Sequence, residues 1–91
     1  MTEEKYLKRL EHYYDEGGRL KQYPSKRPLR ELALYRLAEK FENEKDYSEK
    51  EVNDIIQDNI SFSDVALIRR ELYQLCYLDR EPNGSRYWRI K

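Results

Sequence analysis

The sequence has a single cysteine, a single histidine and no long hydrophobic run, and each scarcity excludes a class of protein. One cysteine, Cys76, cannot form an internal disulfide or a cysteine-rich metal site. No apolar stretch approaches the ~18 residues that a membrane-spanning helix needs, and the first nine residues lack the pattern of a signal peptide. We therefore expect a cytoplasmic protein with no membrane partner.

Groups that could form an active site are also few. His12 lies on a polar flank of the first expected helix, and no nucleophile motif accompanies it. Cys76 falls on the apolar side of the last expected helix, which predicts a buried structural thiol. The acidic residues between 42 and 58 lack the ligand spacing and central glycine of a calcium loop. We expect neither an enzyme nor a bound cofactor or metal.

What the chain does contain is charge and aromatic side chains. Charged residues make up 40% of its 91 residues, apolar residues 38% and aromatic residues 13%, including nine tyrosines. Disordered segments are poor in aromatic residues, so this composition indicates a folded protein. The length fits one core, and we expect a single domain over residues 1–91.

The charges cancel overall but are unevenly distributed along the chain. Residues 1–18 carry a net charge of −2, residues 19–40 +5, residues 41–58 −5 and residues 59–91 +2. A neutral total argues against a strong nonspecific polyanion binder, because such affinity comes from many cationic contacts. The basic segments therefore have to be judged by their position in the fold.

Helical spacing of apolar residues predicts four helices, over residues 2–16, 26–42, 48–59 and 64–77. Gly17 and Gly18 are expected to end the first helix. Pro28 fits only the first turn of the second helix. Ser48 and Glu51 have the spacing of a capping box at the start of the third helix.

A β-hairpin is predicted after the fourth helix. Asn83 and Gly84 favour a type I′ turn between strands at 77–81 and 86–90. The resulting register gives four cross-strand pairs: Glu81 with Arg86, Arg80 with Tyr87, Asp79 with Trp88 and Tyr77 with Ile90. The register supplies one pair of opposite charges and one pair of a cation with an aromatic ring. It also places Tyr77, Trp88 and Ile90 together on the expected core face.

This order of elements predicts a mainly α domain with a C-terminal β-hairpin, of the winged helix-turn-helix type. Two closely spaced helices lead directly into the hairpin, and an earlier helix packs behind them. A helix of this kind can enter the major groove of DNA. The residues expected to bind DNA lie on the second helix, the fourth helix and the hairpin: Lys26, Arg27, Arg30, Arg69, Arg70, Tyr73, Gln74, Arg80, Arg86 and Arg89.

Two functions remain open from the residues alone. In the first, the protein is a DNA-binding transcriptional regulator domain, and its arginines contact phosphates and base edges of double-stranded DNA. In the second, the arginines pair with the acidic third helix, and the protein is a non-enzymatic accessory module. Such a module would bind a regulator protein, a second copy of the chain or a small effector.

Short motifs spread over most of the chain resemble one bacterial family. They are Gly18-Arg19-Leu20, Pro24-Ser25-Lys26, the run from Tyr47 to Asn53, Asp64 with Arg69-Arg70 and Leu72, Asp79-Arg80, and Tyr87-Trp88. Together they resemble the bacterial domain-of-unknown-function family numbered 2087. The resemblance implies a winged-helix-like fold and a transcriptional regulator, since members are often attached to helix-turn-helix repressor domains. Pro28, and Cys76 where a glycine is commoner, depart from the family pattern.

Overall fold

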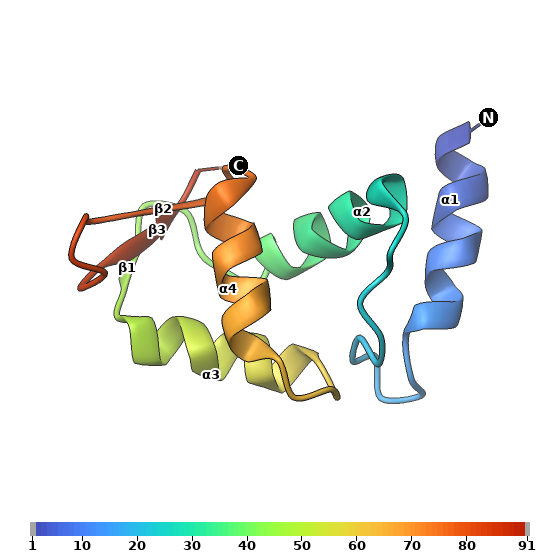
Figure 1. The fold of residues 1–91 in the computed structure, drawn as a ribbon, viewed down its shortest axis with the longest axis horizontal. Coiled ribbons are helices and arrows are strands. Elements are labelled where there is room, and N and C mark those ends of the chain that lie inside the picture. The colour runs from blue at the N-terminus through green and yellow to red at the C-terminus, as the bar shows by residue number, and fades with distance from the viewer. Residues whose placement is uncertain (1, 91) are drawn as a thin grey trace.

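The computed structural model of the protein describes residues 2–90, with side chains from Lys5 onward. Within this range the chain is mainly helical and carries one small antiparallel sheet (Figure 1). The elements, in chain order, are α1 (Thr2–Leu10), the short 3₁₀ helix η1 (Glu11–Tyr13), α2 (Arg27–Ala38), β1 (Asp46–Tyr47), α3 (Glu49–Asn59), α4 (Val65–Gln74), β2 (Leu78–Arg80) and β3 (Tyr87–Arg89).

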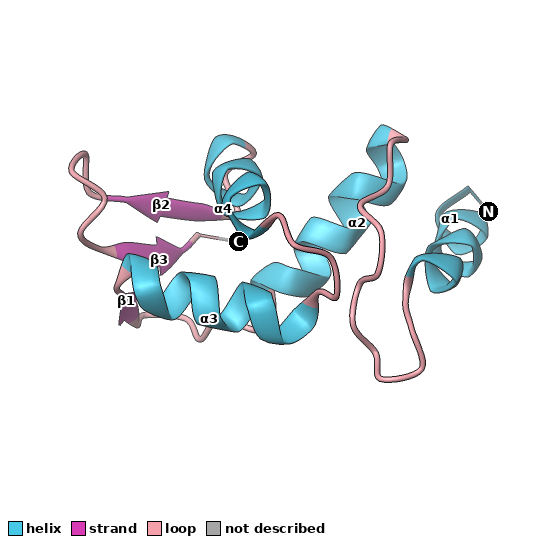
Figure 2. Cartoon of the chain, turned by 60° about the horizontal axis from the view of Figure 1, so that its bottom comes forward, coloured by secondary structure: helices cyan, strands magenta, loops and turns pink. Residues whose placement is uncertain are grey.

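Helix α2 is the centre of the fold. It lies between α1 on one side and α3 and α4 on the other, with the sheet at the end of the molecule opposite α1 (Figures 1 and 2). Leu29, Ala33 and Leu34 of α2 are buried, and Leu10 of α1 and Ile68 of α4 are buried with them in one core. The second helix was predicted over residues 26–42, but it ends at Ala38.

The N-terminal segment turns earlier than its apolar pattern predicts. The helix from Thr2 ends at Leu10, a 3₁₀ turn follows, and Tyr14 is already extended. The reason is Leu20, which is fully buried and must reach the core. Its backbone N–H donates to the carbonyl of Asn59 at 2.9 Å, and its own carbonyl accepts from the N–H of Ser61 at 2.8 Å. The chain therefore has to reverse at the glycine pair, where Gly18 has a φ of +82°.

The helix starts follow the sequence closely. Ser48 caps α3: its hydroxyl accepts from the Glu51 N–H at 3.1 Å, and the Glu51 carboxylate accepts from the Ser48 N–H at 2.8 Å. This is the predicted capping box. At α4, the carboxylate of Asp64 accepts from the Leu67 N–H at 3.3 Å. Pro28 lies in the first turn of α2, as its missing N–H requires.

Helix α4 ends in a Schellman turn that leads directly into the sheet. The Tyr77 N–H donates to the Leu72 carbonyl at 2.9 Å, and the Cys76 N–H donates to the Tyr73 carbonyl at 3.1 Å. Cys76 occupies the left-handed position of this motif, with a φ of +65°. Its side chain is exposed, so the prediction of a buried thiol was wrong. Helix α4 ends at Gln74 and Leu75 is its C-cap, so the apolar pattern of the helix does not extend to Cys76.

The predicted hairpin register is confirmed. Asp79 pairs with Trp88 and Arg80 with Tyr87, and the Glu81 N–H donates to the Arg86 carbonyl at 2.9 Å. The sequence did not reveal β1, a strand of two residues whose Asp46 pairs with Trp88. The sheet order is β1-β3-β2, so β3 is its central strand.

The turn of the hairpin is not the predicted type I′ turn. A type I′ turn needs a positive φ at both Asn83 and Gly84, and only Gly84 has one, at +75°. The Gly84 N–H instead donates to the carbonyl of Glu81 at 2.9 Å. The turn therefore spans 81–84, with Pro82 at its second position and glycine at its fourth. Proline and glycine are favoured at those positions of a type I turn.

The prediction of the core face of the hairpin was wrong for two of its three residues. Leu78 and Tyr87 are buried, whereas Trp88 is half-buried and Ile90 is 52% exposed. Alternate residues of a strand point to opposite faces, so the helices cover the face that carries Leu78 and Tyr87. Tyr77 is nevertheless buried, because its hydroxyl reaches α2 and donates to the Glu31 carbonyl at 3.1 Å.

Replacing Cys76 with glycine should stabilise the protein. Glycine adopts the left-handed conformation without the clash of a Cβ atom, which outweighs its greater freedom in the unfolded chain. We expect a gain of about 1 kcal/mol and a melting temperature about 4–8 °C higher. The matched control is Cys76→Ala, which keeps the Cβ and should not gain. Equal melting temperatures for the glycine and alanine variants, measured by circular dichroism, would contradict this assignment.

The Asp15 carboxyl should titrate below the ordinary aspartate value of 3.8. A hydrogen bond from the Arg19 backbone N–H, at 2.9 Å, is the main cause of the lowered pKa of Asp15. A lowered folded-state pKa means that the ionised carboxylate stabilises the loop above about pH 4, and that this stabilisation is lost as the pH falls through the folded-state pKa. An NMR titration of the carboxyl resonance measures the midpoint. A midpoint at or above pH 3.8 would contradict the stabilisation of the ionised Asp15 carboxylate by the backbone N–H groups of the loop.

Candidate nucleic-acid interface

The outer face of α4 carries three of the residues that the sequence assigns to DNA binding. Tyr73 and Gln74 lie three and four residues after Arg70, and all three are exposed, so they lie on one side of the helix. Ile68 and Leu72 are buried on the opposite side. The helix is thus fixed by its apolar face and presents a cation, a phenol and an amide to solvent.

Arg80 of the hairpin joins this surface. Its guanidinium lies over the ring of Tyr73, with 4.7 Å between the guanidinium carbon and the ring centroid. The predicted cation and ring pair was Arg80 with Tyr87, the residue paired with it on β3. Arg80 reaches Tyr73 instead because the Schellman turn brings β2 back beside the end of α4. We call the four residues Arg70, Tyr73, Gln74 and Arg80 the α4–hairpin face.

Arg69 is directed toward α3 rather than toward solvent, and its side chain is only 20% exposed. Its guanidinium donates to the side-chain oxygen of Asn53 at 2.6 Å and lies 3.7 Å from the carboxylate of Glu49. The same Glu49 oxygen accepts from the Tyr87 hydroxyl at 3.3 Å. Glu49 and Arg69 therefore connect the start of α3, the middle of α4 and β3.

The two arginines of β3 and the turn before it are also engaged. Arg86 forms ion pairs with Glu81 and with Asp46, the latter at 3.1 Å, and lies over the Trp88 ring. The hydrogen bond to Glu81, followed by the charge of Asp46, raises the pKa of Arg86. Its contact with Asp46 links the hairpin to β1. Arg89 donates to the Phe41 carbonyl at 3.1 Å, which links β3 to the segment after α2.

At the start of α2, one of the three predicted cations has no carboxylate partner in the described part of the chain. Lys26 is exposed and precedes the helix. Arg27 pairs with Glu31 at 2.8 Å. Arg30 donates to the Ser25 carbonyl at 2.7 Å and approaches Glu71 of α4 at 3.8 Å. Arg30 thus contributes to the α2–α4 junction rather than to an open surface.

Tyr23 belongs to the same junction, and the sequence did not single it out. Its hydroxyl donates to the Glu71 carboxylate at 2.8 Å, and the Arg30 guanidinium lies 5.8 Å from its ring centroid. Burial raises the pKa of Tyr23, and the hydrogen bond to Glu71 raises it further. The phenol therefore stays neutral and holds the connector before α2 against α4.

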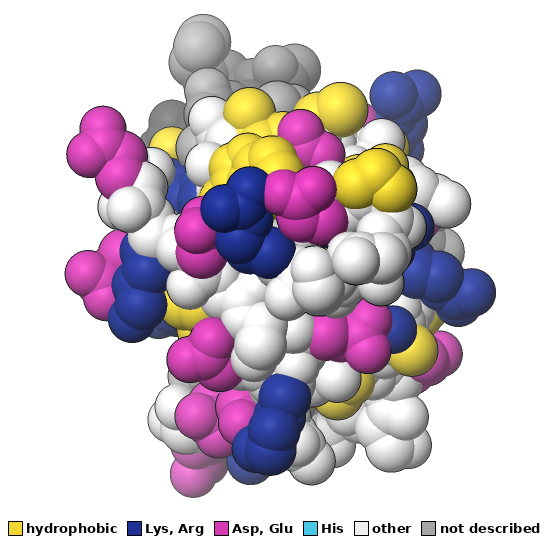
Figure 3. Space-filling view, turned by 90° about the vertical axis from the view of Figure 1, so that its left-hand side faces the viewer, with side chains coloured by type: hydrophobic (Ala, Val, Ile, Leu, Met, Phe, Trp, Pro, Cys, Tyr) yellow, Lys and Arg dark blue, Asp and Glu magenta, His cyan; other side chains and the backbone are white. Residues whose placement is uncertain are grey.

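The structure therefore divides the ten predicted residues into two groups. Arg27, Arg30, Arg69, Arg86 and Arg89 hold carboxylates, an amide or backbone carbonyls. The other five, Lys26, Arg70, Tyr73, Gln74 and Arg80, form no ion pair with the side chains that the structure describes. On the hairpin end of the molecule, basic and acidic side chains alternate, and no uninterrupted basic patch is visible there (Figure 3).

Other kinds of site find no support in the described residues. Histidine, cysteine and acidic side chains nowhere in residues 2–90 come together in a group of three that could hold a metal ion. The described helices include none that is both long and apolar enough to cross a membrane. His12 is exposed, as expected from its polar flank.

The structure is mainly helical, with one small three-stranded antiparallel sheet. The chain belongs to a family of uncharacterized proteins conserved in bacteria, domain of unknown function 2087, whose family model matches residues 19–89. Helices α1 and η1 precede the matched region. Comparisons with curated proteins and with solved structures found no match.

Arg69 should be required for stability through Asn53. We expect Arg69→Ala and Asn53→Ala to destabilise the protein non-additively, with a coupling energy of about 1 kcal/mol, because each removes the same partly buried hydrogen bond. Urea unfolding of the two single variants and the double variant measures this coupling. Coupling between Arg70→Ala and Asn53→Ala is the control and should vanish. Additivity for the Arg69 pair within roughly 0.3 kcal/mol contradicts the assignment.

Proposed function

We propose that the protein binds double-stranded DNA as a winged helix-turn-helix domain of a bacterial transcriptional regulator acting in the cytoplasm. In this proposal α4 enters the major groove, the β2–β3 hairpin is the wing, and the domain has no catalytic step. The order α2, β1, α3, α4, β2, β3 and the sheet order β1-β3-β2 support it, because winged helices connect their elements in this way.

The observation that carries the proposal is the α4–hairpin face. Arginine contacts phosphates and pairs with guanine, and glutamine pairs with adenine in the major groove. Arg70 and Gln74 lie one helical turn apart on the exposed side of α4, so both can reach one groove. Tyr73 holds Arg80 at the edge of this surface, where the guanidinium can contact a phosphate.

The paired arginines have a different role in this proposal. Arg69 fixes α4 on α3, and Arg86 and Arg89 fix the hairpin on β1 and on the segment after α2. They position the surface that contacts DNA. Of the predicted DNA-binding cations only Lys26, Arg70 and Arg80 are available, so few counterions are released on binding. A monomer should therefore bind a generic duplex only with a dissociation constant of ~10⁻⁴ to 10⁻⁶ M.

The salt dependence of binding follows from these three cations. Three phosphate contacts predict a slope of about −2.7 for log K against log salt, which is an affinity about 40-fold lower at 200 mM than at 50 mM salt. Fluorescence anisotropy of a labelled duplex measures it. Affinity that does not depend on salt overturns the proposal.

The variant pair Arg70→Ala with Arg80→Ala separates this surface from a general effect of net charge. We expect it to weaken duplex binding by at least roughly tenfold, since it removes two of three phosphate contacts. The control pair is Lys8→Ala with Lys21→Ala, which removes the same charge from exposed positions outside the α4–hairpin face. The control should bind as the parent protein does. If both variant pairs lose the same duplex affinity, or if neither loses any, the proposed interface is contradicted.

A second candidate function is a protein-interaction module. The ion pairs of Arg27, Arg69 and Arg86 favour it, because these cations are already occupied. So does the exposure of Tyr35 and Ile90, which are 45% and 52% accessible to solvent. For this function, analytical ultracentrifugation should show self-association that substitution of Tyr35 or Ile90 by serine abolishes, together with no affinity for duplex DNA.

A further inference from the structure

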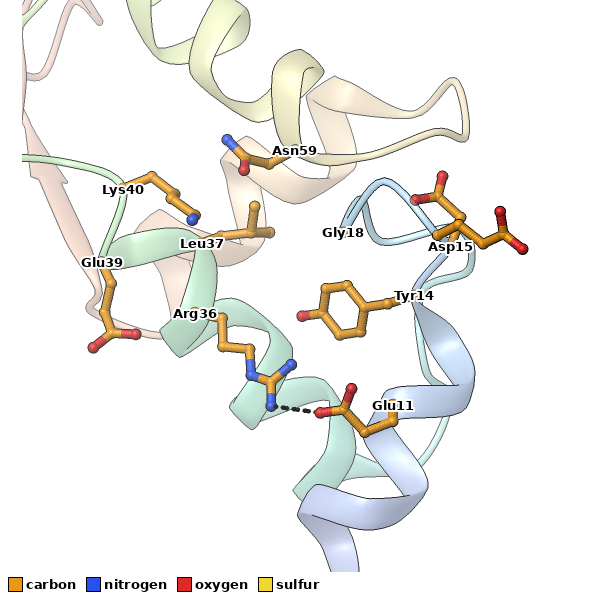
Figure 4. A pocket seen from close by; sticks show the side chains of 10 residues that line it. Glu11, Tyr14, Asp15, Gly18, Arg36, Leu37, Glu39, Lys40 and Asn59 are labelled. Atoms are coloured by element: carbon orange, nitrogen blue, oxygen red, sulfur yellow. Dashed lines mark hydrogen bonds and ion pairs between the residues drawn. The ribbon is translucent and has the colours of Figure 1, made fainter.

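Two pockets lie between the N-terminal segment and α2, and they differ in charge. The larger, of about 470 Å³, lies at the C-terminal end of α2; four carboxylates line it, and its Arg36 is already paired with Glu11 (Figure 4). That lining does not suit an anionic ligand. The other, of about 400 Å³, lies at the start of α2, and we call it the α1–α2 pocket. The described residues that line it include no carboxylate; they are Arg9, His12, Tyr13, Gln22, Lys26 and Leu29.

Backbone hydrogen bonds hold the walls of the α1–α2 pocket in place. The Lys21 N–H donates to the Tyr13 carbonyl at 2.8 Å, which keeps the segment that contains Gln22 beside η1. On the other side, the Arg30 N–H donates to the Lys26 carbonyl at 2.9 Å and fixes the start of α2. The pocket is therefore a feature of the fold, and its volume falls in the ~300–1,000 Å³ range of small-molecule sites.

Two cations of the pocket are not neutralised by an ion pair. Arg9 belongs to α1 and Lys26 immediately precedes α2, and both are exposed. Neither forms an ion pair with a side chain that the structure describes. Because the two cations come from different elements and line one pocket, an anion bound between them is attracted by both.

The neutral lining residues indicate which kind of anion fits. The Tyr13 hydroxyl, the Gln22 amide and a ring N–H of His12 can all donate hydrogen bonds. A phosphate monoester offers three acceptor oxygens and a charge of about −1.5 to −2 at pH 7, whereas a carboxylate offers two oxygens and a single charge. Two cations and several donors therefore match a phosphate group better than a carboxylate. Leu29, which is 1% exposed, and the half-buried Tyr13 supply apolar surface beside it.

We propose that the α1–α2 pocket binds a small organic phosphate, whose phosphate group contacts Arg9 and Lys26 and whose organic part lies against Leu29 and Tyr13. The ligand contacts both the N-terminal segment and the family domain, since Arg9 precedes the matched region 19–89 and Lys26 lies within it. Binding therefore stabilises the packing of α1 on α2. Lys26 is the one residue that this site shares with the proposed DNA interface, and the site is tested without DNA.

Phenyl phosphate is the probe; benzoate carries a carboxylate on the same ring, and benzylammonium carries a cation on a similar one. In a two-dimensional amide NMR titration of the full chain, phenyl phosphate should shift the resonances of Arg9, Tyr13, Gln22 and Lys26 saturably. Benzoate should bind at least roughly tenfold more weakly, because it has fewer oxygens and a smaller charge, and benzylammonium should cause no saturable shift. Absence of saturable shifts with phenyl phosphate, or equal affinity for phenyl phosphate and benzoate, overturns the proposal.

Arg9→Ala and Lys26→Ala test the two cationic contacts. Each should weaken phenyl phosphate binding at least about fivefold, because each removes one charge-assisted hydrogen bond. Lys8→Ala, which removes an exposed lysine of α1 that does not line the pocket, should leave the affinity unchanged. Melting temperatures of the free variants show whether the fold is intact, and Arg9→Met and Lys26→Met, which keep an aliphatic stem, replace the alanine variants if it is not. Equal affinity of the Lys26 and Lys8 variants contradicts the assignment.

Discussion

The reversal of the chain at the C-terminal end of α4 is the constraint on which the rest of the structure depends. Two hydrogen bonds, from Tyr77 to Leu72 and from Cys76 to Tyr73, close α4 and start β2 one residue later. No flexible loop separates helix and strand, so the position of β2 is determined by that of α4. Arg80 consequently meets Tyr73, and the hairpin edge and the outer face of α4 form one surface.

Ion pairs between distant elements occupy several of the arginines. Arg69, Arg86 and Arg30 each connect elements that are distant in sequence, through Glu49, Asp46 and Glu71 respectively. Exposed pairs of this kind contribute little individually, and those that are partly buried contribute through fixed geometry. The arginine contacts therefore hold the helices and strands in place around a small core. Only a few cations remain to bind a partner.

The sequence predicted two features that local chemistry decides, although it did not predict the type of the hairpin turn. Capping at Ser48 and Glu51 and the hairpin register follow from residues close together in the chain, and both are correct. Features that depend on distant packing were not predictable. The two residues of β1 form a strand only because β3 lies beside them, and the face of the hairpin that is buried is decided by the helices that cover it.

The candidate site shows the same division. Helical periodicity indicates that Arg70, Tyr73 and Gln74 lie away from the apolar side of α4, and all three are exposed. Arg69 lies one position away on the same helix, yet its partner Asn53 is 16 residues distant, and no local pattern indicates that contact. A list of arginines therefore overestimates the cations available to DNA, because pairing is a property of the fold.

The measurement that tests the account most directly is an amide chemical-shift map of the protein titrated with a generic DNA duplex. If α4 binds DNA as proposed, the shifts are concentrated at Arg70, Tyr73, Gln74 and Arg80, and the amides of Tyr14 and Lys40 are unchanged. Shifts confined to α1 or to the acidic helix α3, or no shifts at all, would contradict it.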